Sequence, residues 1–330
     1  MSDTHARHIL LLGAGFSRNW GGWLADEVGN YLLTCPEVKT NHALRSALTR
    51  HANFEAALSE LQTTYLQSRS IEAKRNVDDL QNAVLRMFRT MDQGFRDTQF
   101  EFQSDGGYMV RTFLNRFDAI FTLNQDYLLE RHYLNDNVML ASGGRWQGWQ
   151  IPGMIRVHDP SRQPLDLAPV TWKPDPGGFR VHKNYQPYFK LHGSSNWITS
   201  EGEELLIIGS NKLSRIQGED ILRHSFDTFA GFLAQGSKLM IIGYGFRDEH
   251  INTALVEAAR RGQLQLFVID ELGRKAMDQN NRTLHAPIYV PSEPAQSLGP
   301  TLIGASRRRL SETFKDDRVE HALVMSFFDN

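Results

Sequence analysis

The sequence contains almost no cysteine: Cys35 is the only one among 330 residues. A single thiol can form neither an internal disulfide nor a four-thiolate zinc site, and it is compatible with a reducing compartment. Long apolar runs are also missing. The apolar stretch at residues 8–12 ends at Gly13, and no later stretch approaches the roughly twenty apolar residues that a membrane span needs. We therefore expect a soluble, unprocessed, cytoplasmic protein with no membrane partner.

A strong net charge is absent as well, because 36 Lys and Arg residues nearly balance 38 Asp and Glu residues. The formal charge of -2 excludes a broad electrostatic field for nucleic acid, so we expect no direct nucleic-acid binding. The basic run at residues 307–309 is followed by Glu312, Asp316 and Asp317. Neighbouring charges of both signs favour a solvated helix face over a nucleic-acid contact.

Short apolar segments that alternate with helical patterns predict the fold class. Such segments are typical of buried parallel strands, and they lie at residues 8–12, 120–123, 188–191, 205–209, 238–242 and 263–270. Strands that alternate with helices predict an α/β fold, with a Rossmann-like parallel sheet flanked by helices.

Two stretches interrupt this alternation. From about residue 41 to residue 116, apolar residues recur at intervals of three and four, which predicts a helical insertion. Residues 141–187 are rich in Gly, Pro and Trp, which favours an irregular loop. Beyond residue 271, the pattern predicts a strand at 287–290, a helix around 305–314 and a last strand at 322–328. We divide the chain into a catalytic domain, residues 1–272, and a C-terminal extension, residues 273–330, that packs on the core or serves assembly.

Polar or glycine-rich turns follow five of the predicted strands. The carboxyl ends of parallel strands lie at one edge of a sheet, where open α/β folds bind their ligands. We therefore expect five turns to meet in one cleft: residues 13–17, 124–126, 192–193, 243–245 and Asp270.

Each of these motifs alone also has a purely structural interpretation. Gly-x-Gly after a strand often makes only a tight turn, and the dehydrogenase fingerprint needs a third glycine where this chain has Arg18. Asn124 and Asp126 are residue types that cap the backbone readily, and a lone histidine such as His192 suits a core position. Asp270, in turn, suits the cap of a following turn.

Together the motifs resemble the sirtuin family, and more closely its bacterial sirtuin-like branch of NAD-cleaving defence proteins. "GAGFS" (13–17) is similar to Gly-Ala-Gly-x-Ser, and "TLNQD" (122–126) is similar to Thr-x-Asn-x-Asp. "LHGS" (191–194) resembles the catalytic His-Gly, and "IIGYGFRDEHIN" (241–252) resembles the Gly-Tyr-x-Phe-x-Asp-x-His-Ile-Asn motif of the branch. The order of the motifs agrees too, and the resemblance spans about residues 8–272.

The chain departs from the sirtuin deacylases at two places. Those enzymes carry a zinc ribbon built from two Cys-x-x-Cys pairs, whereas no cysteine follows Cys35 here. Their Gly-Ile-Pro-Asp-Phe-Arg motif is replaced by "GWLADE" after Gly21. We therefore expect no zinc ribbon, no zinc or other metal, and no acyl-lysine module.

The resemblance implies NAD as the substrate and assigns a role to each site residue. The catalytic residues it implies are Asn124, which would hold the ribose or the attacking water, Asp126, which would orient that hydrogen-bond network, and His192. An unperturbed histidine pKa of about 6.5 suits a general base at neutral pH. The phosphates would be held by residues 14–17, the adenosine half by Gly243 and Gly245, and the adenine ribose by Asp270. The full set expected to bind NAD is Gly13, Ala14, Gly15, Phe16, Ser17, Gly193, Gly243, Tyr244, Gly245 and Asp270.

A second stretch of the last motif has weaker assignments. Asp248 is expected to be a helix N-cap, while His250 and Asn252 match the branch motif without an assigned role.

The function that the resemblance implies is hydrolysis of NAD to nicotinamide and ADP-ribose, which depletes NAD in phage-infected cells. Oxocarbenium-like cleavage of this bond needs no general acid, because nicotinamide leaves as a neutral amide. The resemblance further implies a homo-oligomer and a partner such as a HerA-type hexameric ATPase. The alternatives are transfer of ADP-ribose or an acyl group to an acceptor, and a non-catalytic module that binds NAD or ADP-ribose.

Overall fold

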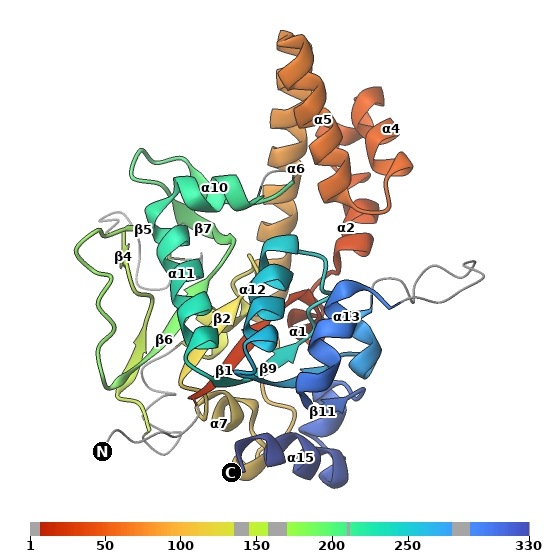
Figure 1. Ribbon diagram of the computed structural model, residues 1–330. Helices are drawn as coiled ribbons and strands as arrows, with labels where there is room; N and C mark the ends of the chain where they lie inside the picture. Colours follow the sequence, from red (N-terminus) through yellow and green to blue (C-terminus); the bar gives the residue numbers. More distant parts are fainter. Residues whose placement is uncertain (1–6, 135–144, 158–169, 210–211, 279–290, 330) are drawn as a thin grey trace.

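Parallel strands form the central seven-stranded sheet, in the order β11-β10-β9-β1-β2-β6-β3 (Figure 1). The computed structural model describes residues 7–134, 145–157, 170–209, 212–278 and 291–329. The strands of this sheet are β1 (Arg7–Leu12), β2 (Ala119–Thr122), β3 (Gly148–Gln150), β6 (Tyr185–Lys190), β9 (Ser237–Ile242), β10 (Leu264–Ile269) and β11 (Leu302–Ser306). The architecture confirms the predicted α/β fold.

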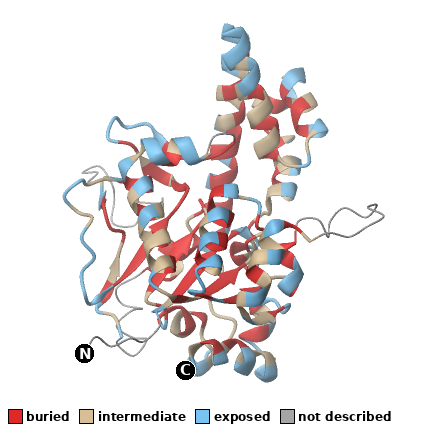
Figure 2. Cartoon of the chain, viewed as in Figure 1, coloured by how far each residue is buried: buried red, intermediate tan, exposed pale blue. Residues whose placement is uncertain are grey.

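Both faces of the sheet are buried under helices (Figure 2). On β1, Ile9 and Leu11 belong to one hydrophobic cluster, whereas Leu10 and Leu12 belong to the other, and all four are fully buried. Because successive side chains of a strand point to opposite faces, a strand covered on both faces must be apolar at every position. The first face packs against α11 (Asp220–Ala234), α12 (Glu249–Arg260), η2 (Gly273–Met277) and α13 (Glu293–Leu298).

The strand order reverses direction at β1. From β1 the chain proceeds to β2 and β6 on one side, and later to β9, β10 and β11 on the other. Leu12, at the end of β1, pairs with Thr122 on β2 and with Ile242 on β9. The carboxyl ends of β1 and β9 therefore border a topological switch point, the place where open α/β sheets leave a crevice for ligands.

The predicted helical insertion is confirmed and contributes to the second face of the sheet. On α6, Val77, Leu80, Val84, Met87 and Met91 are buried at helical intervals. None of the helices in the described ranges is long and apolar enough to cross a membrane. In Figure 1, α4, α5 and α6 rise away from the sheet. The helices between β1 and β2 are α1 (Ala14–Arg18), α2 (Ala25–Leu32), α3 (Pro36–Lys39), α4 (His42–Arg50), α5 (Phe54–Ser68), α6 (Ile71–Arg96), η1 (Gly106–Tyr108) and α7 (Val110–Leu114).

The prediction of an irregular loop over residues 141–187 is wrong in part, because short strands interrupt the irregular backbone of the described residues there. Besides β3, two further strands form there, β4 (Met154–Arg156) and β5 (Trp172–Pro174). They join β7 (Gly193–Ile198) and β8 (Glu204–Leu206) in a second sheet of order β4-β5-β7-β8. Strands of three residues are too short to show a period of two, so the Gly, Pro and Trp content dominated the sequence pattern.

The tail also differs from its prediction. Residues 305–314 contain the end of β11 and the short helix α14 (Leu310–Thr313), and the expected last strand is helical, as α15 (Arg318–Met325) and η5 (Ser326–Phe328). An apolar run this short fits either element, and here the ring of Phe327 packs on those of His8 and Phe117. β11 pairs with β10, so the central sheet continues past residue 272. The strand expected at 287–290 lies outside the described residues.

Candidate functional site

A cleft of about 740 Å³ lies at the carboxyl ends of β1, β2 and β9. Its lining brings together all but two of the residues expected to act on NAD: Gly13, Ala14, Gly15, Ser17, Asn124, Asp126, His192, Gly243, Tyr244, Gly245 and Asp270. Among the described residues, Phe16 and Gly193 are not part of this lining. Phe16 is a core side chain with 1% exposure, and a Cβ on Gly193 would lie 2.1 Å from the carbonyl oxygen of Leu205.

Glycines bring the two central turns of the cleft into direct backbone contact. The Gly15 N–H donates to the Gly243 carbonyl at 2.9 Å, and a Cβ on Gly15 would lie 2.6 Å from the Cα of Gly243. Gly243 has φ of +64°, a conformation that only glycine adopts without strain. We expected Gly243 to admit the adenosine half of NAD, but its lack of a side chain is required by Gly15.

The amides at the start of α1 are only partly available to a phosphate. The Gly15 N–H is bonded to Gly243, and the Phe16 N–H donates to the Gly13 carbonyl at 2.9 Å. The expectation that every amide from residue 14 to residue 17 receives the pyrophosphate therefore does not hold for these two. Further positive groups are needed to hold two phosphates.

Ser17, Asn124 and Asp126 form a hydrogen-bonded chain between the first two turns. The Asn124 Nδ2 donates to the Ser17 Oγ at 3.0 Å, and the Ser17 hydroxyl donates to Asp126 Oδ2 at 2.7 Å. The other oxygen of Asp126 accepts the Leu128 N–H at 3.0 Å. Ser17 and Asp126 are only 2% and 6% exposed. These buried hydrogen bonds therefore fix the orientation of the Asn124 amide. The carbonyl oxygen of Asn124 is not used in this chain.

His192 follows β6 and is held by Gln125. The Gln125 Nε2 donates to the carbonyls of His192 and Ile207, at 3.3 and 2.6 Å. Burial lowers the pKa of His192 to about 3, although the charge of Asp248 opposes this shift. The unperturbed value assumed from the sequence is thus wrong for the folded chain, and the imidazole is neutral at pH 7.

His192 lies against the second histidine of the site, His250 on α12. Their Nε2 atoms are 2.9 Å apart, so one proton can be shared between the two rings. His250 is also buried, and burial lowers its pKa. The sequence motif contains both residues, but only the fold places residue 192 beside residue 250.

Asp248 belongs to the same cluster. It occupies the N-cap position of α12, as expected, but its side chain makes no capping hydrogen bond. Its Oδ1 instead accepts from the Lys212 Nζ at 2.7 Å, and Lys212 also contacts Glu55 Oε2 at 2.8 Å. Burial alone would raise the pKa of Asp248, but the net effect of its surroundings lowers that pKa, and the ammonium group of Lys212 contributes through its charge and its hydrogen bond. The Asp248 side chain is therefore a charged member of the site, and it does not cap the start of α12.

Tyr244 and Asn252 hold the turn that carries this cluster. The Tyr244 hydroxyl donates to Asn252 Oδ1 at 3.0 Å and accepts the Asp248 N–H at 3.1 Å. Asn252 Nδ2 donates to the carbonyl of Phe246, whose φ of 52° is unusual for a residue with a side chain. Tyr244 is 3% exposed, so its ring stabilises the turn and little of it faces the cleft.

Cationic side chains that the sequence analysis did not assign to the site also line the cleft. They are Arg18, Lys212, Arg247, Arg308 and Arg309. Arg308 and Arg309 were expected on a solvated helix face, but they precede α14 at the edge of the cleft, and 58% and 69% of their side chains are exposed. Folding rather than local pattern collects these charges, so their positions in the sequence gave no signal.

Lys190 is a fully buried lysine beneath the site, and the sequence analysis missed it. Its Nζ donates to the Asp126 carbonyl and to Glu130 Oε1, both at 2.5 Å, and to Ser194 Oγ at 2.7 Å. Glu130 lies on α8 (Leu128–His132). The only signal in the sequence is a single charge within the apolar segment at residues 188–191, which is rare in a buried strand unless the charge is paired.

Asp92 on α6 is a buried carboxyl group behind the same turn. It is 4% exposed, and its Oδ1 accepts the Tyr127 N–H at 2.9 Å. Burial raises its pKa to about 7, and the charge of Asp126 adds to this shift. A carboxyl group whose pKa is higher in the folded chain than in the unfolded chain binds more protons when folded. The free energy of unfolding therefore decreases as the pH rises from about 4 to about 7.

Replacement of Asp92 by asparagine should remove this dependence. Asparagine keeps an oxygen for the Tyr127 N–H but carries no charge, so we expect Asp92→Asn to stabilise the protein at pH 8, by up to about 4 kcal/mol from a shift of about three pKa units. The gain should shrink at pH 5. Urea denaturation of both proteins at the two pH values measures it. Equal stability of the two proteins at pH 8 would show that the carboxylate is not destabilised in the folded state.

Comparison with known proteins assigns the family. The family model described as "SIR2-like domain" matches residues 118–286, just over half of the chain. No curated protein sequence matched the chain.

Solved structures with a similar trace have low sequence identity. One is a mutant Sir2 homologue in complex with 2′-O-acetyl ADP-ribose, 12% identical, with a TM-score of 0.43, covering 99% of this chain and 96% of that one. A Sir2 homologue in complex with NAD is 11% identical, with a TM-score of 0.42 and coverage of 98% and 92%. Sir2Tm bound to a propionylated peptide is 10% identical, with a TM-score of 0.35 and coverage of 96% and 94%. The assignment of the family therefore rests on the sequence match.

Proposed function

The chain belongs to the SIR2-like domain family, and from this premise we propose that it hydrolyses NAD to nicotinamide and ADP-ribose. The observation that supports the proposal is the pairing of two features in one cleft. The hydrogen bonds that link Ser17, Asn124 and Asp126 fix the Asn124 amide in place, and His192 supplies a neutral imidazole. Both lie at the switch point of the sheet, where a dinucleotide fits across the strand ends.

The chemistry matches what these side chains offer. When the bond between nicotinamide and the ribose C1 breaks, its electron pair neutralises the pyridinium ring, so no acid is required. The sugar passes through an oxocarbenium-like state, and the oxygen of water forms the new bond to C1. As this bond forms, the water becomes strongly acidic, and a weakly basic imidazole suffices to take its proton. A pair of catalytic carboxylates is not needed.

Each residue has one task in this reaction. Asn124 holds the ribose or the water, and its amide is fixed by Ser17, which is itself oriented by Asp126. His192 takes the proton, and the carboxylate of Asp248 stabilises the resulting imidazolium. Positioning of this kind supplies much of the rate enhancement of an enzyme that forms no covalent intermediate.

The dinucleotide itself is held by the turns and the arginines of the cleft. Arg18, Arg247 and Arg308 supply positive charge for the pyrophosphate, because the amides of Gly15 and Phe16 in α1 are already bonded. Asp270 accepts hydrogen bonds from the hydroxyls of the adenine ribose. Ala14 and Gly245 line the cleft between the adenosine half and the nicotinamide half of the dinucleotide.

The wider role that we propose follows from the resemblance of the motifs. The protein acts in the cytoplasm as the NAD-depleting effector of an abortive-infection defence against phage. It works as a homo-oligomer and is activated by a partner, for which a HerA-type hexameric ATPase is the candidate.

The test follows nicotinamide and ADP-ribose after incubation of the purified protein with NAD, alone and with the protein encoded beside it. Hydrolysis gives one molecule of free ADP-ribose for each nicotinamide released. Release of the two products in equal amounts is the expected result. Release of nicotinamide with ADP-ribose attached to protein or nucleotide would identify a transferase instead. Binding of NAD without any release would leave only the role of a binding module.

A further inference from the structure

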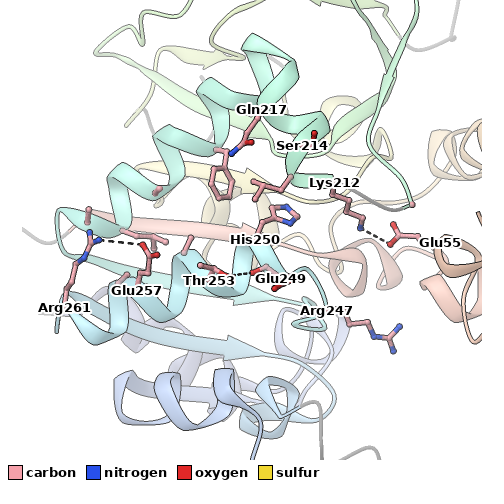
Figure 3. A pocket seen from close by; sticks show the side chains of 18 residues that line it. Glu55, Lys212, Ser214, Gln217, Arg247, Glu249, His250, Thr253, Glu257 and Arg261 are labelled. Carbon is pink, nitrogen blue, oxygen red and sulfur yellow. Dashed lines mark hydrogen bonds and ion pairs between the residues drawn. The ribbon is translucent and has the colours of Figure 1, made fainter. Parts of the chain in front are cut away.

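Two cavities of the protein meet at the pair of histidines. His192 and Asp248 line the cleft described above, whereas His250 lines a second cavity of about 910 Å³ between α10 (Lys212–Gly218), α11 and α12 (Figure 3). Glu55, Lys212 and Arg247 line both. His192 and His250, together with Asp248, thus form a buried polar partition, a layer of side chains between the two cavities that is accessible from both.

Three metal-binding side chains converge in this partition. One ligand atom each of His192, Asp248 and His250 lies within 4.8 Å of the other two. The two imidazole Nε2 atoms are 2.9 Å apart, whereas two nitrogens that bind a tetrahedral zinc ion at 2.0–2.1 Å are separated by about 3.3 Å. A shift of a few tenths of an ångström therefore gives the two nitrogens the separation that a shared metal ion requires, and the carboxylate of Asp248, within 4.8 Å of both, turns towards the ion.

We propose that His192, Asp248 and His250 bind one divalent transition-metal ion, of which Zn²⁺ is the best match. Two neutral imidazoles and one carboxylate are a donor set that zinc prefers over Mg²⁺ or Ca²⁺, which favour oxygen. Three protein ligands leave a fourth position for water from the cleft.

The charges around the cluster favour a cation. Asp248, Glu55 and Glu249 contribute three carboxylates, and Lys212 and Arg247 contribute two cations. Lys212 contacts Oδ1 of Asp248, which leaves Oδ2 for a metal, and it keeps Glu55 as a partner when Asp248 turns towards the ion. The ion therefore adds positive charge to a site whose carboxylates outnumber its cations by one.

The consequence for activity rests on the proposed function. A metal ion on Nε2 of His192 occupies the nitrogen that contacts His250 and replaces the proton that the pair shares. His192 therefore cannot bind the metal ion and act as the general base at the same time. The metal-loaded protein is the silent form, and removal of the ion releases His192.

The test measures metal binding without NAD. Untagged protein is treated with a chelator, dialysed and titrated with Co²⁺, whose visible absorption is intense only in four-coordinate sites. We expect one equivalent per chain, displaced by Zn²⁺. Asp248→Asn and His250→Gln should each weaken binding by more than about 100-fold, the upper limit for the loss of an outer-shell partner. His224→Gln is the matched control, because His224 is a histidine on α11 that lines neither cavity.

Several outcomes would overturn the proposal. No four-coordinate spectrum at excess Co²⁺ shows that the pair only shares a proton, and a spectrum unchanged in both ligand variants places the ion elsewhere. Thermal melting of each variant shows whether it is folded, and Asp248→Asn keeps the size of its side chain. Cobalt binding by a protein whose metal-free form cleaves no NAD, alone or with the protein encoded beside it, contradicts the proposed function alone. If the wild-type protein cleaves NAD, saturating Zn²⁺ should stop the cleavage and a chelator should restore it, whereas undiminished cleavage contradicts the silencing role.

Discussion

Replacement of His192 by glutamine should lower the rate of NAD cleavage by roughly 10² to 10⁴-fold, the range that a general base contributes. Glutamine retains a polar side chain next to His250, but it cannot take a proton at neutral pH. The loss should fall on kcat with little change in KM, because the proton is transferred only after the substrate is bound. Nicotinamide release at saturating NAD measures the effect.

A variant of Asn124 tests the same mechanism independently of His192. Asn124→Ala removes the amide that Ser17 and Asp126 orient, so cleavage should fall to a similar extent. Ser17→Ala leaves the amide in place but unsupported, so its rate should lie between those of the wild type and Asn124→Ala. His224→Gln, outside the cleft, should cleave NAD like the wild type. A His192→Gln protein that melts normally and keeps its full rate would remove the base from the mechanism.

Local sequence patterns were sufficient for β1, β2, β6, β9 and β10 of the central sheet and for the turns of the cleft, but not for the edge strands β3 and β11. Side chains such as Leu10 and Ile241 are apolar and buried on opposite faces of the inner strands, so composition alone indicates these strands. Glycines at 13, 15 and 243 are required by a backbone contact between two turns, and so they stand out at the ends of their strands. The switch point then brings together residues that are far apart in the chain.

What the sequence could not provide depends on contacts between distant segments. The pairing of His192 with His250, and of Lys212 with Asp248, depends on how α10 and α12 pack above the sheet. The pKa of His192 is set by its burial, which no local pattern reports. Short edge strands such as β4 and the apolar tail at residues 322–328 fit two structures equally well, and tertiary packing decided between them.

Replacement of Lys190 by methionine should be the most destabilising single change at the site, at about 3–5 kcal/mol of unfolding free energy. Methionine fills the space, but Glu130 is left 2% exposed without its partner, and the Asp126 carbonyl and the Ser194 hydroxyl lose a donor. Burial already raises the pKa of Glu130, and loss of the ammonium group raises it further. The folded variant therefore takes up a proton, so its deficit should be larger at pH 8 than at pH 5.

Urea denaturation of a matched set of variants separates the pair from its surroundings. Glu130→Gln added to Lys190→Met should recover much of the lost stability, because no charge is then left buried. Lys74→Met removes the lysine of an exposed pair with Asp78, and it should leave stability almost unchanged. If Lys190→Met is as stable as the wild type at pH 8, the buried pair of Lys190 and Glu130 does not stabilise the folded chain. If the double variant is as unstable as Lys190→Met, the hydrogen bonds to Asp126 and Ser194 contribute more than the charge pair does.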